Sequence, residues 1–117
     1  MAVDITTPHI KTLQRQHGIP VQIVRAGRIC NLTAVPAMSE ANLVGKDGSF
    51  TEIKVDDWLV LVSEWTLEGS PQKGDEIRVD TTTRYLVSHP DATKPHFQNF
   101  NQLDRPAKAW RIHSVPR

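Results

Sequence analysis

The chain has 117 residues, of which 38% are apolar, and a formal net charge of +1. This length suits one domain, expected over residues 1–117, with a modest core. The near-zero net charge excludes a global electrostatic case for nucleic-acid binding. The single cysteine, Cys30, excludes an intrachain disulfide and fits a reducing compartment.

The low apolar fraction has two explanations, long exposed loops or a surface that neighbouring subunits order. The N-terminal residues do not combine a basic region with an apolar stretch, so we expect no signal peptide. No apolar segment is long enough to cross a bilayer, so no membrane association is predicted.

The first predicted element is a short helix over residues 8–17. Thr7 is a good N-cap, Pro8 is favoured at the first helical position, and Gly18 provides a stop. Only Ile10 and Leu13 form an apolar face, so the helix cannot be stable alone. We expect it to dock on a sheet or on a neighbouring chain.

Barrel strands are predicted between residues 19 and 88. The first hairpin turns at Ala26-Gly27, is bracketed by Pro20 and Pro36, and places Cys30, Leu32 and Ala34 on one face. After it, residues 39–43 are compatible with a helical turn. Residues 46–49 carry a turn signature. A strand over 50–55 is then expected to end at the polar boundary Asp56-Asp57.

Residues 57–79 form the central stretch of the chain. Five apolar residues from Trp58 to Val62 predict a strand covered on both faces. Residues 63–67 could form one helical turn capped by Ser63. The sequence Pro71-Gln72-Lys73-Gly74-Asp75 is typical of a turn, and strands over 76–79 and 84–88 would follow it as a hairpin.

The last strand is predicted over residues 109–115, with Trp110 and Ile112 on its buried face and Arg111 and His113 outside. Residues 89–108 before it form a predicted long loop. The sum is a mostly β chain of about seven short strands, which favours a small antiparallel barrel or sandwich with one N-terminal helix.

Two aromatic residues, Phe97 and Phe100, lie in this polar loop where no local core is evident. Either the loop folds back over the domain, or the two rings insert into a partner. The last thirteen residues, 105–117, hold four basic residues and no acidic residue. They form either a solvated end or a basic surface.

Motifs for chemistry are absent from the sequence. The five histidines and Cys30 lack the spacing of a metal site, and there is no nucleophile motif, P-loop or dinucleotide fingerprint. Asp56 and Asp57 are neighbours that would point to opposite faces of a strand, so they are poor candidates for sharing a proton or metal. We therefore predict no catalytic residues, no metal and no cofactor, and the chain is not expected to be an enzyme.

The order of several weak motifs resembles the head–tail joining and head-closure (stopper) proteins of tailed bacteriophages, including the lambda-type joining proteins. An aspartate-led apolar strand (57–62) is followed by a short corner (65–67) and the Pro-x-x-Gly-Asp turn (71–75). An aromatic-bearing strand (85–87), a variable loop and a terminal Arg-Ile-His (111–113) complete the layout. The resemblance covers about residues 50–117.

The resemblance implies a β-barrel that assembles into a homo-oligomeric ring, a hexamer or a dodecamer, in the virion. Its partners would be a portal or adaptor protein above, a tail protein below and packaged DNA in the channel. Assembly would take place in the host cytoplasm. Candidate contacts to partners or DNA are Phe97, Phe100, Arg105, Lys108, Arg111 and Arg117.

Two other functions remain open at this point. A tail terminator or tail-completion protein is also a ring-forming interaction protein, and the sequence separates it poorly from a joining protein. The alternative of another class is a small β-barrel that binds single-stranded nucleic acid. Such a barrel would carry exposed aromatics interleaved with Lys and Arg, whereas Trp58 and Trp110 lie in apolar surroundings.

Overall fold

The fold is mostly β, with one short helix at the N-terminal end. A computed structural model describes residues 6–100 and 108–117. Helix α1 is Thr6–His17, and the short 3₁₀ helix η1 is Val62–Glu64. The strands are β1 (Ile19–Arg25), β2 (Arg28–Val44), β3 (Phe50–Leu61), β4 (Glu76–Arg78), β5 (Arg84–Val87), β6 (Phe97–Asn99) and β7 (Ala109–Pro116).

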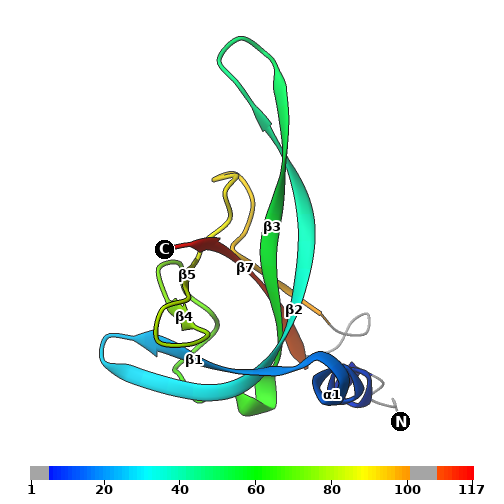
Figure 1. Ribbon diagram of the computed structural model, residues 1–117, viewed down its shortest axis with the longest axis vertical. Helices are drawn as coiled ribbons and strands as arrows, with labels where there is room; N and C mark the ends of the chain where they lie inside the picture. Colours follow the sequence, from blue (N-terminus) through cyan, green and yellow to red (C-terminus); the bar gives the residue numbers. More distant parts are fainter. Residues whose placement is uncertain (1–5, 101–107) are drawn as a thin grey trace.

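Six of the strands close into an antiparallel barrel. They follow the order β3-β2-β1-β4-β5-β7, and a pairing of β3 with β7 closes the ring. Strand β7 makes this possible because it pairs with β3 along Ala109–Ser114 and with β5 along Ser114–Pro116. The predicted mostly β fold with a barrel is therefore confirmed (Figure 1).

The barrel interior is filled by alternate residues of its strands, as the period of two requires. Trp58 pairs with Ile112 across β3 and β7, and both side chains are buried there. The indole N–H of Trp58 donates to Ser114 Oγ at 2.9 Å, so its polar atom is satisfied. The predicted inner faces are confirmed: Cys30, Leu32, Ala34, Trp110 and Ile112 all belong to this core.

Helix α1 lies outside the barrel and covers a second, smaller core. Ile10 is fully buried there and packs with residues of β2, β3 and β7, among them Val35, Leu59 and Ala109. Leu13 packs against the same cluster. The helix thus docks on the sheet of its own chain, which meets the stability requirement inferred from its narrow apolar face.

Strands β2 and β3 are much longer than the sequence suggests. The expected helical turn at 39–43 is wrong, because these residues continue β2 and pair with residues 51–55 of β3. The expected strand break at Asp56-Asp57 is also wrong, since β3 runs through both residues. Pairing over ten successive positions outweighs weak local preferences.

Pro36 lies inside β2 instead of ending it. Strand β1 pairs with β2 only as far as Ala34, so β2 has a free edge from that point onward. A free edge is where a sheet tolerates proline, because no ladder donor is needed there.

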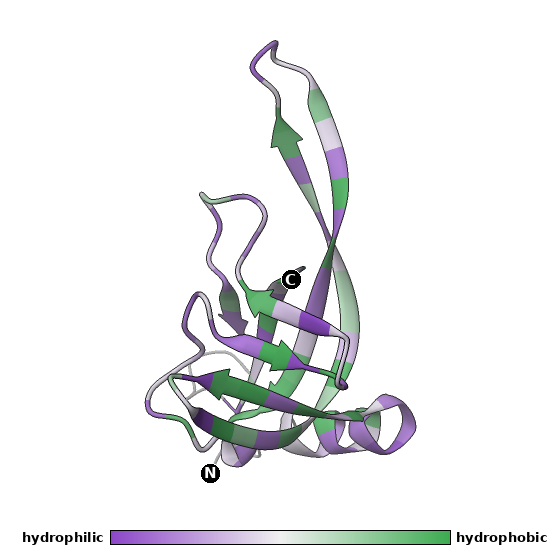
Figure 2. Ribbon diagram, turned by 60° about the vertical axis from the view of Figure 1, so that its left-hand side comes forward, coloured by the Kyte–Doolittle hydropathy of each residue, from purple (hydrophilic) through white to green (hydrophobic). Residues whose placement is uncertain are grey.

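The outer parts of β2 and β3 form a two-stranded arm, residues 38–56, that projects from the barrel (Figure 1). Apart from Asp56, which pairs with Ser114 of β7, neither strand of the arm has a further strand partner within the described residues. The pairing of β1 with β2 ends at Ala34, and the pairing of β7 with β3 ends at Asp56. Apolar and polar residues alternate along the arm (Figure 2). Its exposed apolar residues are Met38, Val44 and Phe50.

The predicted loop over 89–108 contains a strand that the sequence did not indicate. Residues 97–99 form β6, which pairs with β7 beside the β5 segment. The three-residue strand is too short to show a periodic pattern. The predicted cap of the 63–67 turn is wrong as well: η1 begins one residue earlier, and no side chain caps it.

Candidate functional site

The outer face of the β3–β7 pair carries a buried ionic network. Asp57 is 1% exposed although it lies outside the barrel. Its Oδ1 is 2.7 Å from Nδ1 of His113, the residue directly opposite on β7. Its Oδ2 accepts a hydrogen bond of 2.6 Å from Nε of Arg111. A carboxylate that sequence reasoning placed at a polar boundary is therefore paired with two β7 side chains.

Burial by itself would raise the pKa of Asp57. Hydrogen bonds with His113, Arg111 and Ser39 act in the opposite direction and outweigh it, so the pKa of this carboxyl lies below its ordinary value. Asp57 is consequently ionised at neutral pH. Arg111 also donates to the backbone oxygen of Met38 at 3.0 Å, which joins the network to the first residue of the arm.

A polar cleft of about 500 Å³ opens between the base of the arm and the loop after β5. The arm contributes Ser39–Asn42, and the loop contributes His89, Asp91 and Lys94. The ring of His89 packs edge-on against that of His113, with 4.9 Å between centroids. Burial, and next the nearby His113, lower the pKa of His89, so this imidazole tends to be neutral.

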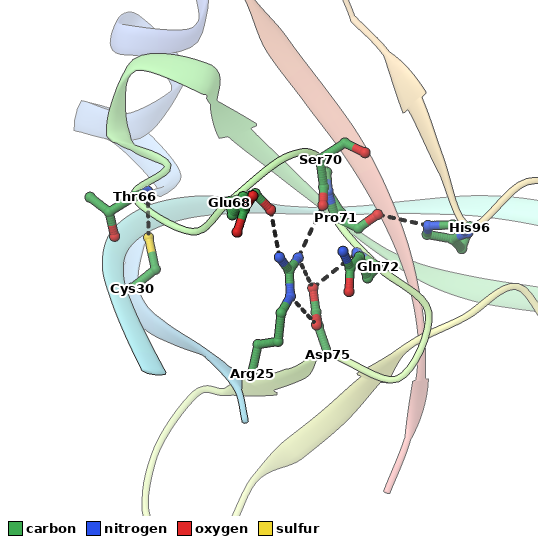
Figure 3. A network of polar contacts seen from close by, with 9 residues as sticks. All are labelled: Arg25, Cys30, Thr66, Glu68, Ser70, Pro71, Gln72, Asp75 and His96. Atoms are coloured by element: carbon green, nitrogen blue, oxygen red, sulfur yellow. Dashed lines mark hydrogen bonds and ion pairs between the residues drawn. The ribbon is translucent and has the colours of Figure 1, made fainter. Parts of the chain in front are cut away.

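The Pro-x-x-Gly-Asp turn is held to the barrel by Arg25 (Figure 3). The guanidinium of Arg25 donates to both carboxylate oxygens of Asp75, at 2.8 and 2.7 Å. It also donates to the backbone oxygens of Glu68 and Ser70. One bidentate arginine thus fixes residues 68–75 on the end of β1.

The glycine and proline of this turn have separate roles. Gly74 has a φ of 93°, a conformation that a residue with a Cβ rarely adopts. Pro71 is buried, and its backbone oxygen lies 2.8 Å from Nε2 of His96 (Figure 3). The turn therefore connects β1 to the loop that leads to β6.

The two loop phenylalanines fold back onto the protein. Phe97 packs against the barrel core, with its ring 6.0 Å from that of Trp110. Phe100 packs against the second core and lies 6.5 Å from the ring of His9. Of the two alternatives for these rings, the structure shows the one in which the loop folds back over the domain. Both remain half-buried, and contact of their exposed edges with a partner stays a prediction.

The predicted basic contacts do not form one patch. Arg111 belongs to the Asp57 network, and Arg117 pairs with Glu76. Lys108 is exposed at the start of β7. Arg105 lies outside the described residues. The positive charge of Arg111 is largely committed to Asp57, which sequence reasoning could not anticipate from an alternating strand.

Within residues 6–100 and 108–117, no group of three or more His, Cys, Asp or Glu side chains could hold a metal ion. The same residues include no helix that is long and apolar enough to cross a membrane.

Sequence reasoning missed two features, the Asp57 network and the arm. The sequence did hold a signal for the Asp57 network. Asp57 adjoins a run of apolar residues, and Arg111 and His113 lie two residues apart, on the same face of the last strand. The sequence held no such signal for the arm. Residues 38–44 pair with residues 50–56 in one register, and no clear apolar periodicity in these residues indicates that register.

The closed antiparallel barrel and the projecting arm define a small β-barrel protein. The chain belongs to the phage head-tail joining protein family, which it matches over residues 5–117. No curated protein matches the chain in sequence. Family membership implies a structural protein that is located in the virion and interacts with portal and tail proteins.

Proposed function

We propose that the protein forms a homo-oligomeric ring, a hexamer or a dodecamer, between the portal or adaptor protein and the tail. The ring closes the DNA-filled head and provides the surface on which the tail docks. Assembly takes place in the host cytoplasm, and no bond is made or broken. Closure follows from a symmetric head-to-tail arrangement of subunits.

The observation that carries this proposal is the arm, on a chain of the head-tail joining family. A two-stranded ribbon is marginally stable at best by itself. The arm has free edges on both sides and exposes Phe50 by 74%, Val44 by 64% and Met38 by 58%. Exposed apolar residues gathered on one projection indicate a surface that a partner covers.

The test is a cryo-electron-microscopy map of virions from the source, with a search for this fold at the junction of portal and tail. A ring of barrels between portal and tail supports the proposal and gives the stoichiometry. A ring at the top of the tail tube, bound to tails that lack heads, would instead assign the role of tail terminator or tail-completion protein. Absence of the chain from virions would overturn both.

Contact with packaged DNA is a separate part of the proposal. Lys108 is its best test residue, because it is exposed, whereas Arg111 holds Asp57 and Arg117 pairs with the buried Glu76. We expect Lys108→Gln to reduce DNA retention in assembled particles while heads and tails still join. Unchanged retention would remove the DNA contact and leave the ring proposal intact.

The competing function is binding of single-stranded nucleic acid by the isolated barrel. It predicts oligonucleotide binding that weakens steeply with salt. The core positions of Trp58 and Trp110 argue against it, since their rings are buried and cannot stack on bases. Fluorescence anisotropy with a labelled oligonucleotide over a range of salt concentrations checks this directly.

A further inference from the structure

Three arginines surround one carboxylate on the outer face of β4 and β5. Glu76 pairs with Arg78 and Arg117, and its Oε1 lies 3.8 Å from Arg84. Glu76 is buried, whereas the side chains of Arg84 and Arg117 are 41% and 55% exposed. This arginine cluster (Arg78, Arg84, Arg117) therefore keeps an excess of about two positive charges over its single acid.

An apolar groove adjoins the arginine cluster. A cavity of about 480 Å³ lies between the first half of β1 with its β2 partner and the turn that joins β4 to β5. Pro20, Val21, Leu32 and Val79 give it apolar walls, and Arg78 and Arg84 line it as well. The one acid in its lining, Asp80, accepts hydrogen bonds from Thr82 and Thr83 within its own turn. The groove suits an apolar group that is accompanied by carboxylates.

The arm has the opposite character. Register pairing puts Met38, Glu40, Asn42, Val44, Phe50, Glu52, Lys54 and Asp56 on one face of the arm. Three acids against one lysine give this acidic arm face a net charge of about −2. The neighbouring Glu52 raises the pKa of Glu40, first because the two carboxyl groups can share a hydrogen bond when one is protonated, and next because they repel each other when both are ionised. Within the described residues, neither carboxylate has an ion pair.

From this complementarity we propose that the acidic arm face of one copy docks on the arginine cluster and apolar groove of the next copy. Phe50 or Met38 enters the groove, and Glu40 and Glu52 meet Arg78 and Arg84. The inference rests on the proposed ring and specifies its subunit contact. The two surfaces are different parts of the chain, so the contact is heterologous, the kind that closes into rings.

Two variants separate the halves of the contact. Glu40→Lys with Glu52→Lys reverses the arm, and Arg84→Glu reverses the most weakly paired exposed arginine of the cluster. Each variant alone should self-associate at least tenfold more weakly than the wild type, measured by sedimentation velocity at low ionic strength. An equimolar mixture should form 1:1 dimers, because the intact cluster of the first accepts the intact arm of the second.

Matched controls reverse charges outside both surfaces. Glu68→Lys and Lys73→Glu are substitutions at exposed positions and should leave self-association unchanged. A further variant, Phe50→Ala, tests the apolar part of the contact and should weaken association without changing thermal unfolding, since Phe50 is 74% exposed. Thermal unfolding of every variant confirms that its fold is intact.

Equal association of the wild type, both reversal variants and their mixture, including no association at all, would overturn the proposal. The ring itself is judged separately on virions. A ring at the portal–tail junction in which the arms contact no neighbouring subunit would refute the arm contact and leave the proposed function standing. Absence of the ring from virions, together with the expected 1:1 dimers in solution, would refute the proposed function and leave the contact between arm and arginine cluster standing.

Discussion

At the scale of single residues, Asp57 is the point where β3 and β7 are joined by charge as well as by backbone pairing. Its carboxylate is removed from water and is compensated by Arg111 and His113. Removing one partner of a buried pair is expensive, because the remaining charge stays desolvated. The network therefore matters for stability although it lies outside the barrel core.

We predict that Asp57→Asn lowers the free energy of unfolding by about 1.5–3 kcal/mol, the range for hydrogen bonds to charged groups. Asparagine has a similar shape but cannot compensate the charge of Arg111. Urea unfolding followed by tryptophan fluorescence measures the loss. Asp91→Asn is the control. The Asp91 carboxylate lies in a loop and accepts hydrogen bonds from Thr93, two residues away, so this substitution should change the unfolding free energy little. A loss in unfolding free energy below about 0.5 kcal/mol, the size of the effect of a typical surface substitution, would contradict the prediction.

The Asp57 network also predicts a dependence of stability on pH. The folded protein holds the pKa of Asp57 below that of the unfolded chain, so ionisation of Asp57 stabilises the fold at neutral pH. This contribution begins to be lost below about pH 4, the ordinary carboxyl range, and disappears as pH falls through the lower folded-state pKa. Unfolding curves of the wild type and Asp57→Asn should converge over this range. A constant difference down to acid pH would assign the stabilisation to another group.

Trp58 is the residue whose replacement tests the barrel core. It is 5% exposed and contacts Tyr85 edge-on, with 5.3 Å between ring centroids. We expect Trp58→Ala to destabilise the protein by about 3–5 kcal/mol, since a large cavity would open in the interior. Calorimetric unfolding is the measurement, and an effect near zero would mean that the ring does not fill the barrel.

At the scale of elements, the arm is separable from the barrel. Ala41 and Ile53 are directly paired, so residues 42–52 can be replaced by Asn-Gly while the register is kept. We expect the shortened protein to change in unfolding free energy by less than about 1 kcal/mol, because the deleted residues are almost all exposed.

The proposed function predicts that the same shortened protein no longer joins heads to tails, because most of the surface proposed to contact a partner is removed. In vitro complementation of heads with tails, counted by electron microscopy, measures this. Normal joining by a stably folded shortened chain would show that the arm has no part in assembly.

At the scale of the whole molecule, closure by β7 makes the barrel one cooperative unit. Strand β7 contacts β3, β5 and β6, and all three tryptophans pack in or against the barrel core. We predict a single unfolding transition that coincides in tryptophan fluorescence and far-ultraviolet circular dichroism. Two separated transitions would mean that α1 or part of the sheet unfolds independently.

Local patterns in the sequence determined the mostly β class, the N-terminal helix, the first hairpin and the inward faces of β2 and β7. These features follow from alternation and turn chemistry, which act between near neighbours in the chain, whereas the predicted cap Thr7 lies inside α1, which begins at Thr6. The order of weak motifs also indicated the joining family. The sequence also indicated that the rings of Phe97 and Phe100 pack either on the domain or against a partner.

Only the tertiary structure decided the length of β2 and β3, the arm, strand β6 and the pairing of Asp57 with Arg111 and His113. The arginines of the cluster come together for the same reason: Arg78 and Arg84 face each other across β4 and β5, and Arg117 arrives from the end of the chain. These features depend on register and on contacts between segments distant in sequence. A single residue of slip would change every one of them, and no local pattern encodes that register.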